Sequence, residues 1–328
     1  MKRGTFIALV IAAICLVAVP RVIVNEFYVN MATQVLIYAL FALSINMMLG
    51  YGGMVSLGHS AYLGVAGYAC ILLNIAGYDQ LTSAILAVLF STAFAGLFGV
   101  LSLRAPGLGF IMITLAIGQI VWGIAYRANE LTGGDNGLRL PARPKPLGIS
   151  LASAENFYYF TLVVFLVALF FIWRFSRSAF GASLKGTRDQ PRRMSMLGYN
   201  VWLIRWLTFV MAGFWGSVAG ILFVYYNVFL SPHAIALQQS AEILLMAILG
   251  GANTLTGPIV GAVIITLVKN VASSYVERWN TLLGAIFVIV IIFMPYGLVP
   301  GCLQLWRRIC AKFEKRAPAH IDTPSSAI

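Results

Sequence analysis

The chain has 328 residues, of which 60% are hydrophobic and 10% are charged, and its mean hydropathy is +0.89. Soluble domains carry roughly 25% charged residues, so this composition excludes a single soluble core and indicates an integral membrane protein. The net charge of +12 is explained by cytoplasmic loop cations and anionic lipid, without any nucleic-acid partner.

Ten apolar stretches are candidates for membrane spans, each of which takes about 20 residues of helix. They predict an all-α polytopic fold with some short or broken helices and both termini in the cytoplasm. The predicted spans are 6–24, 31–49, 59–75, 81–101, 108–126, 157–173, 203–225, 240–250, 258–272 and 281–299. The run 240–268 is either one long span or two short spans broken at 250–258.

The first span follows Met1-Lys2-Arg3, a beginning that also suits a secretory signal peptide. Its apolar run to Val24 is long for that role, and no clean cleavage site follows, so we expect a retained helix. With the amino terminus inside, most of the 22 Lys and Arg residues are cytoplasmic, as the positive-inside rule requires. Lys269 counts among the cations outside.

This topology gives a transmembrane domain over 1–306 and a basic cytoplasmic tail over 307–328. A periplasmic loop spans 127–156, and its glycine, Asp-Asn and proline signals predict a surface or re-entrant loop. A cytoplasmic loop spans 174–202 and is too charged to cross the membrane.

The cytoplasmic loop contains signals for a short helix. Pro191 suits the first helical turn and Gly198 the end, so a helix is predicted over about 190–197. Arg192 and Arg193 give it a basic character, and Met194, Met196 and Leu197 give it an apolar side. Such a helix is suited to dock into a partner.

Two glycine-rich segments resemble each other: GGMVSL at 52–57 and GGANTL at 250–255. Both lie at predicted cytoplasmic ends of spans. Transporters often carry repeats with broken helices in corresponding positions, so an internal repeat and a chance match are the two readings.

Several chemistries are missing from the sequence. It has no G-x-x-x-x-G-K-[ST] loop for ATP, no H-E-x-x-H and no G-x-S-x-G, so no cofactor, metal or catalytic residue is expected. The cysteines, Cys15, Cys70, Cys302 and Cys310, have no metal or disulfide spacing. The sequence therefore indicates a polar path through the membrane in a protein that does not itself hydrolyse ATP.

The glycine cluster within 50–64 predicts non-helical backbone, which membranes tolerate only where protein or water covers it. Polar residues within the spans complete a candidate translocation path. Its members are Asn46, Gly52, Gly53, Ser56, His59, Ser60, Thr114, Gln119 and Glu242. The alternative role for His59 is an interhelical hydrogen bond, and for Glu242 a snorkelling or helix-start charge.

Five motifs in order resemble the permeases of branched-chain amino acid ABC importers. They are GYGGMVSLGHSAYLGVAGY (50–68), GLGFIMITLAIGQI (107–120), TGGDNGL (132–138), FGASLKGTRDQPRRMSMLGYNV (180–201) and GGANTLTGPIVGA (250–262). The order and spacing match over most of the chain, and the 132–138 loop is similar to the M-type rather than the H-type subunit.

The resemblance implies a bacterial inner-membrane assembly. A second homologous permease, two ATP-binding subunits that hold ATP and Mg, a periplasmic substrate-binding protein and membrane lipid are its expected partners. The coupling region implied is Gly181, Lys185, Arg188, Asp189, Arg192, Arg193, Leu197 and Gly198. The chain departs from the commoner pattern over 191–194.

Three alternatives stand beside this reading. Relatives on similar scaffolds move urea, amides or other small polar solutes. A self-sufficient secondary carrier or channel would need its own coupling-ion site, and Glu242 is the single acid within a predicted span. An intramembrane enzyme would need His59 and Glu242 together as acid and base, and nothing in the sequence places them together.

Overall fold

The computed structural model describes residues 20–21, 25–141, 145, 151 and 153–275, with backbone alone for 271–275. Short pieces at 281, 284–285, 288, 292 and 297–301 are also described. Most of the predicted span 6–24, most of 281–299 and the whole tail 307–328 lie outside the described residues.

The described chain is mostly helical. Its five helices long and apolar enough to cross a membrane are α2 with the π-helical turn η1 (Glu26–Tyr51), α4 (Gln80–Ser102), α5 (Leu108–Arg127), α7 (Ala154–Ser176) and α10 (Val201–Asn227). Three further apolar helices are α3 (Ser60–Ile75), α11 (Leu237–Gly250) and α12 (Gly257–Tyr275). Each predicted span from 31–49 to 258–272 coincides with one of these helices.

Polar side chains determine where five of the helices begin. The capping residues of α2, α4, α7, the later helix α8 (Ala179–Asp189) and α10 are Asn25, Asp79, Ser153, Ser178 and Asn200. Each accepts a hydrogen bond from a backbone N–H of the first turn, a group that has no partner within the helix. The sequence therefore places these starts locally, before any tertiary packing.

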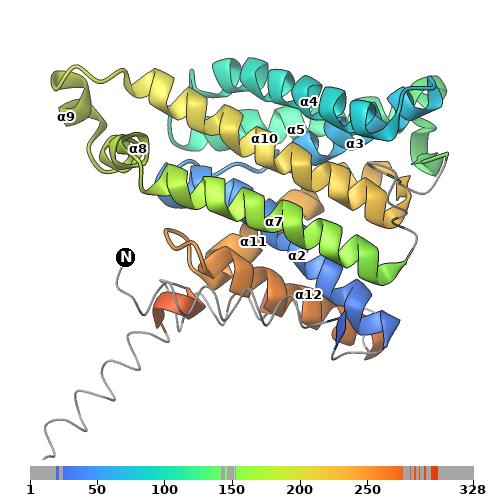
Figure 1. Ribbon diagram of the computed structural model, residues 1–328. Helices are drawn as coiled ribbons and strands as arrows, with labels where there is room; N and C mark the ends of the chain where they lie inside the picture. Colours follow the sequence, from blue (N-terminus) through green and yellow to red (C-terminus); the bar gives the residue numbers. More distant parts are fainter. Residues whose placement is uncertain are drawn as a thin grey trace, which may run out of the picture.

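Helix α2 is the central element of the bundle. It packs against α7 and α10 on one side and against α11 and α12 on the other (Figure 1). The helices α3, α4 and α10 form a second group, which α5 covers. Large apolar side chains remain exposed on α4, α5 and α7, for example Phe90, Met112 and Phe170. These outer surfaces are suited to contact lipid.

The run 240–268 is two short helices rather than one span. Helix α11 ends at Gly250, and the next residues include Gly251 at φ +117° and Asn253 at φ +74°. Such left-handed backbone cannot continue an α-helix, so the chain turns. A Cβ on Gly261 would lie 1.8 Å from the carbonyl oxygen of Met246, so only glycine allows this close approach of α12 to α11.

The two long loops lie at opposite ends of the bundle. Helices α8 (Ala179–Asp189) and α9 (Pro191–Met196) lie at one end, left in Figure 1, and α10 leads from there to the other end. The segments at that other end are α6 (Asn129–Thr132), η2 (Gly134–Asn136), η4 (Pro232–Ile235) and β1 (Leu138–Arg139), which pairs antiparallel with β2 (Phe229–Leu230). This arrangement agrees with the predicted periplasmic and cytoplasmic loops. Helix α9 confirms the predicted short helix, whereas α8 was not predicted.

Candidate functional site

Arg188 joins three separate segments at the α8 end of the bundle. From the last turn of α8, its Nη1 donates to the carbonyl oxygen of Gly50 over 2.6 Å. The same nitrogen donates to the side-chain oxygen of Asn253, in the break between α11 and α12. Its Nε forms an ion pair with Asp189 at 2.9 Å. One guanidinium therefore ties the predicted coupling loop to both glycine-rich segments.

The end of α2, just before the first glycine-rich segment, lies against the second one. The Nδ2 of Asn46, at the end of α2, donates to the carbonyl oxygen of Thr254 over 2.9 Å. Thr254 in turn accepts from the backbone N–H of Gly257 and so caps α12. The sequence signals both segments, but only the fold brings them together. We call this contact, made by Asn46, Gly50, Gly53, Arg188, Asn253 and Thr254, the break junction.

Glycine is required at two positions of the break junction. Gly53 has φ +67°, and a Cβ there would lie 2.6 Å from Cγ of Arg188. A Cβ on Gly50 would lie 2.6 Å from the backbone nitrogen of Asn253. Gly52 has an ordinary negative φ, but its Cβ would lie 2.7 Å from the carbonyl oxygen of Met48. The glycine cluster therefore serves close packing around Arg188.

The rest of α8 anchors this contact in the bundle. Leu184 is fully buried, and the Nζ of Lys185 lies 5.2 Å from the ring centroid of Tyr51 in η1. Arg205 of α10 donates to the carbonyl oxygen of Thr187 over 3.2 Å. A Cβ on Gly181 would lie 2.4 Å from the carbonyl oxygen of Phe175, which explains the glycine in this tight turn. Helix α8 is thus held by both α2 and α10.

Helix α9 projects from α8; Met194 packs back against Gly186 of α8, and most of the other side chains face outward. The side chains of Arg192 and Arg193 are exposed, as are those of Met196, at 86%, and Leu197, at 66%. Gly198 follows with φ +85° and ends the helical segment. An exposed apolar and basic surface of this kind is typical of a docking site.

His59 is part of the helix core. Its ring is fully buried, stacked on Phe41 and edge-on to Tyr62. Its Nε2 lies 2.8 Å from the hydroxyl of Ser44. Because that hydroxyl donates to the carbonyl of Phe41, its oxygen remains to accept from Nε2–H. The interhelical hydrogen bond that the sequence left open is therefore made here.

Ser60 links the start of α3 to the start of α11. Its hydroxyl donates to the carbonyl oxygen of Ile235, and its backbone N–H donates to the hydroxyl of Ser240 over 3.0 Å. Ser56 is also buried, and its hydroxyl has no partner among the described residues. The role of both residues in a water-lined path stays a prediction.

The two path candidates on α5 have different surroundings. Thr114 is buried, and its hydroxyl accepts from the backbone N–H of Leu57 over 3.3 Å. It thereby holds the irregular segment before α3 against α5. Gln119 is half-buried further along the same helix.

Glu242 is paired inside the membrane domain. Both of its carboxylate oxygens lie 3.0 Å from Nζ of Lys269, which also lies 5.7 Å from the ring centroid of Tyr38. Lys269, which the charge count placed on the outer side, lies on α12 within the predicted span 258–272, and its ammonium is paired with α11 instead of standing free at the outer surface. Neither snorkelling nor a helix-start charge describes Glu242, because its carboxylate is buried against a lysine.

Sequence reasoning missed the partners of this ion pair. Beside it, Asn270 donates its amide to the side-chain oxygen of Gln34 over 3.2 Å. Gln34 and Tyr38 lie one turn apart on α2, and Lys269 and Asn270 are neighbours on α12. The i, i+4 spacing of Gln34 and Tyr38 indicates a polar face on α2, but it does not indicate which helix packs against that face.

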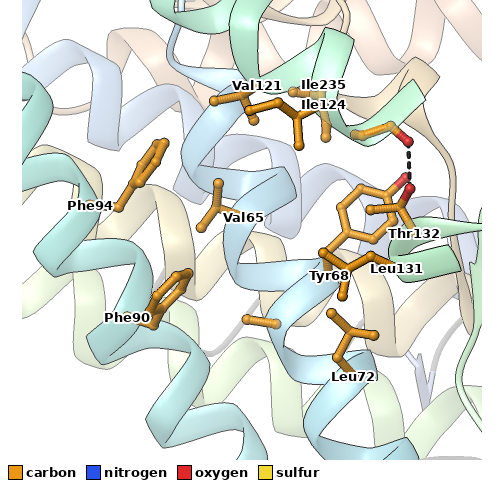
Figure 2. Close-up of a pocket in the computed structure, with 12 residues that line it drawn as sticks. Val65, Tyr68, Leu72, Phe90, Phe94, Val121, Ile124, Leu131, Thr132 and Ile235 are labelled. Atoms are coloured by element: carbon orange, nitrogen blue, oxygen red, sulfur yellow. Dashed lines mark hydrogen bonds between the residues drawn. The ribbon is translucent and has the colours of Figure 1, made fainter. Parts of the chain in front are cut away.

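An apolar cavity of about 290 Å³ lies apart from these polar residues. Figure 2 shows Val65 and Tyr68 of α3 on one side of it and Phe90 and Phe94 of α4 on another. Leu131 and Thr132 close it near the loop that follows α5. Because Phe90 and Leu131 are exposed, the cavity lies toward the outer surface of the bundle rather than at the break junction.

Comparison with known proteins gives one consistent result. The family model described as "Branched-chain amino acid transport system / permease component" matches residues 27–294. The chain is 27% identical to the high-affinity branched-chain amino acid transport system permease protein LivM of Salmonella typhimurium, over 84% of this chain and 71% of that protein. It is 25% identical to LivH of the same organism, over 80% of this chain and 91% of that protein.

A relative with another printed substrate matches as well. The autoinducer 2 import system permease protein LsrC of Salmonella paratyphi B is 28% identical over 80% of this chain and 76% of that protein. No solved structure matches the chain. The family match covers the break junction, the coupling loop and the buried ion pair together. The chain therefore belongs to the branched-chain amino acid transport system permease family of multi-pass membrane proteins.

Proposed function

We propose that the chain is the M-type permease subunit of an ATP-driven importer for branched-chain or related amino acids. It pairs with a second homologous permease in the bacterial inner membrane. Two ATP-binding subunits hold ATP and Mg on the cytoplasmic side, and a periplasmic binding protein delivers the substrate. The chain itself contributes the path and the mechanical connection, and no catalysis.

The break junction is the observation that carries the mechanism. Arg188 belongs to the helix beside α9 and contacts both the end of α2 and the break between α11 and α12. A displacement of α8 would therefore pull at once on the π-helical end of α2 and on the break between α11 and α12. Such segments are the parts of a helical bundle that change conformation at least cost.

Helix α9 supplies the attachment. Met196 and Leu197 are large apolar side chains that face outward, and Arg192 and Arg193 add positive charge. Closure of the ATP-binding subunits, transmitted through α9 and α8, moves the segments around 50–58 and 251–256. Substrate then crosses between the two permeases by alternating access.

Amino acids are proposed as substrates because most of the reported relatives carry branched-chain amino acid transport in their names. The LsrC relative favours a second candidate, a small polar non-amino-acid solute, on the same mechanism. A self-sufficient carrier is disfavoured by the exposed docking surface of α9.

Isolation with natural partners tests the proposal. The tagged chain is extracted in gentle detergent, and the copurified proteins are identified and tested for uptake in proteoliposomes. A second permease, ATP-binding subunits and ATP-dependent leucine uptake are expected. Uptake by the chain alone, without ATP, would overturn it. Uptake of autoinducer 2 and no amino acid would select the second candidate.

A further inference from the structure

The Glu242–Lys269 ion pair joins α11 to α12 within the described part of the membrane domain. The Glu242 side chain is 4% exposed, and both of its oxygens contact the ammonium of Lys269. A buried ion pair stabilises a fold little, because the cost of removing two charges from water offsets their attraction. Its retention therefore calls for a role beyond packing.

The pair lies within two helices of the membrane domain, away from the break that joins them. Lys269 is twelve residues from Gly257, the first residue of α12, which is roughly 18 Å along a helix that rises 1.5 Å per residue. The hydrocarbon core of a membrane is about 30 Å thick. Glu242 is eight residues from Gly250, the last residue of α11, which is roughly 12 Å by the same rise. Both charges therefore lie within the helices rather than in the break between them, and charged residues inside membrane helices mark substrate or ion pathways.

The surroundings of the pair divide into polar and apolar parts. Polar groups are supplied by Tyr38, Gln34 and Asn270, from α2 and α12. Buried apolar side chains follow the charged residues closely along α11 and α12, among them Ile243, next to Glu242, and Ile265, one turn before Lys269. Two opposite charges with buried aliphatic side chains on the same two helices match a zwitterion that carries an aliphatic side chain.

We propose that Glu242 and Lys269 bind the two charged ends of an α-amino acid as it crosses the membrane. The substrate ammonium takes the place of Lys269 on the Glu242 carboxylate, while the substrate carboxylate takes the place of Glu242 on the Lys269 ammonium. A zwitterion that opens the pair replaces both charge-assisted bonds, whereas an uncharged solute would leave the buried Glu242 carboxylate without a positively charged partner. The inference rests on the proposed function and names its recognition site.

The complete importer in proteoliposomes, with its binding protein and Mg-ATP, provides the first test. The variant Glu242→Gln/Lys269→Gln removes both charges without leaving either one unpaired. The matched control is Thr33→Val, because Thr33 is buried on α2 and donates to Val29 of its own helix. Two measurements are made on each complex: the rate of ATP hydrolysis and the rate of leucine uptake.

For the double variant, leucine uptake is expected to fall by about tenfold or more while ATP hydrolysis changes by less than about twofold, and the control stays near wild type in both. Leucine uptake near the wild-type rate in the double variant would overturn the site and leave the proposed function intact. A wild-type importer that hydrolyses ATP but takes up no amino acid would instead refute the proposed function.

A second test uses the wild-type importer, so it can locate the substrate even if the double variant does not assemble. Photo-leucine, a leucine analogue with a diazirine in its side chain, is delivered to the wild-type importer and activated during turnover. Adducts are expected on peptides that contain Tyr38, Glu242 or Lys269. Adducts confined to other helices would overturn the site.

Discussion

The guanidinium of Arg188 donates a hydrogen bond to the carbonyl oxygen of Gly50, although 138 positions separate them in the chain. This bond joins the last turn of α8 to the end of α2. Under the proposed function, Arg188 is the residue through which a movement of α8 would reach the membrane-spanning helices.

Arg188→Glu is expected to uncouple the importer. The carboxylate cannot donate to Gly50 or Asn253, and it repels Asp189. Helix α8 would therefore lose its hydrogen bonds to the end of α2 and to the break between α11 and α12. The protein should still reach the membrane, because the apolar spans are unchanged. Uptake per ATP hydrolysed should fall by about tenfold, as expected for the loss of charged hydrogen bonds of about 1.5–3 kcal/mol.

Arg192→Glu is the control for this experiment, because it reverses an exposed charge on α9 without touching the break junction. It should weaken binding of the ATP-binding subunits while leaving the uptake per ATP of assembled complexes unchanged. Normal uptake by Arg188→Glu would refute the coupling role of the junction.

Gly53→Ala should damage the junction through Arg188. The new Cβ would lie 2.6 Å from Cγ of Arg188. The alanine would also have to keep the positive φ of Gly53, which costs about 1–2 kcal/mol. Gly77→Ala is the matched control, since Gly77 has φ +91° but open space around its Cβ. The midpoint temperature of thermal unfolding in detergent should fall for both variants. The uptake per ATP hydrolysed should fall only for Gly53→Ala. Equal uptake losses would show that backbone strain alone is responsible.

Met196→Ala should weaken attachment of the ATP-binding subunits. Met196 is 86% exposed on α9, and burial of its side chain in a partner would contribute about 1.5–3 kcal/mol. Titration of purified ATP-binding subunits onto the permease pair should show affinity lower by roughly tenfold. Met112→Ala, at an exposed position of α5, should change nothing. An unchanged affinity for Met196→Ala would place the docking surface elsewhere.

Ser56→Cys tests the proposed water-lined path. All natural cysteines are first replaced, and a charged thiol reagent is applied with and without ATP turnover. Ser56 is 1% exposed here, so labelling is expected only during turnover. Ala42→Cys, fully buried on α2, should remain unlabelled in both conditions. If cysteines at positions 56, 59 and 60 all stay unlabelled during turnover, the path runs through another part of the bundle.

Local pattern alone determined much of this protein. The apolar runs predicted the spans because the bilayer sets the length of any helix that crosses it. Pro191 and Gly198 predicted α9, since each acts on the backbone next to it. The glycines at 250–257 indicated a break, which the structure places between α11 and α12. None of these features depends on which helix lies beside which.

The tertiary structure alone decided the contacts that carry function. Sequence placed Glu242 in a span but could not pair it with Lys269, because the pair requires α11 and α12 to face each other after a sharp turn. The same holds for Arg188 with Asn253 and for Asn46 with Thr254. The length of an apolar run indicates how much of a helix lies in lipid. The choice of neighbouring helix depends instead on close packing at glycines and on hydrogen bonds between buried polar groups.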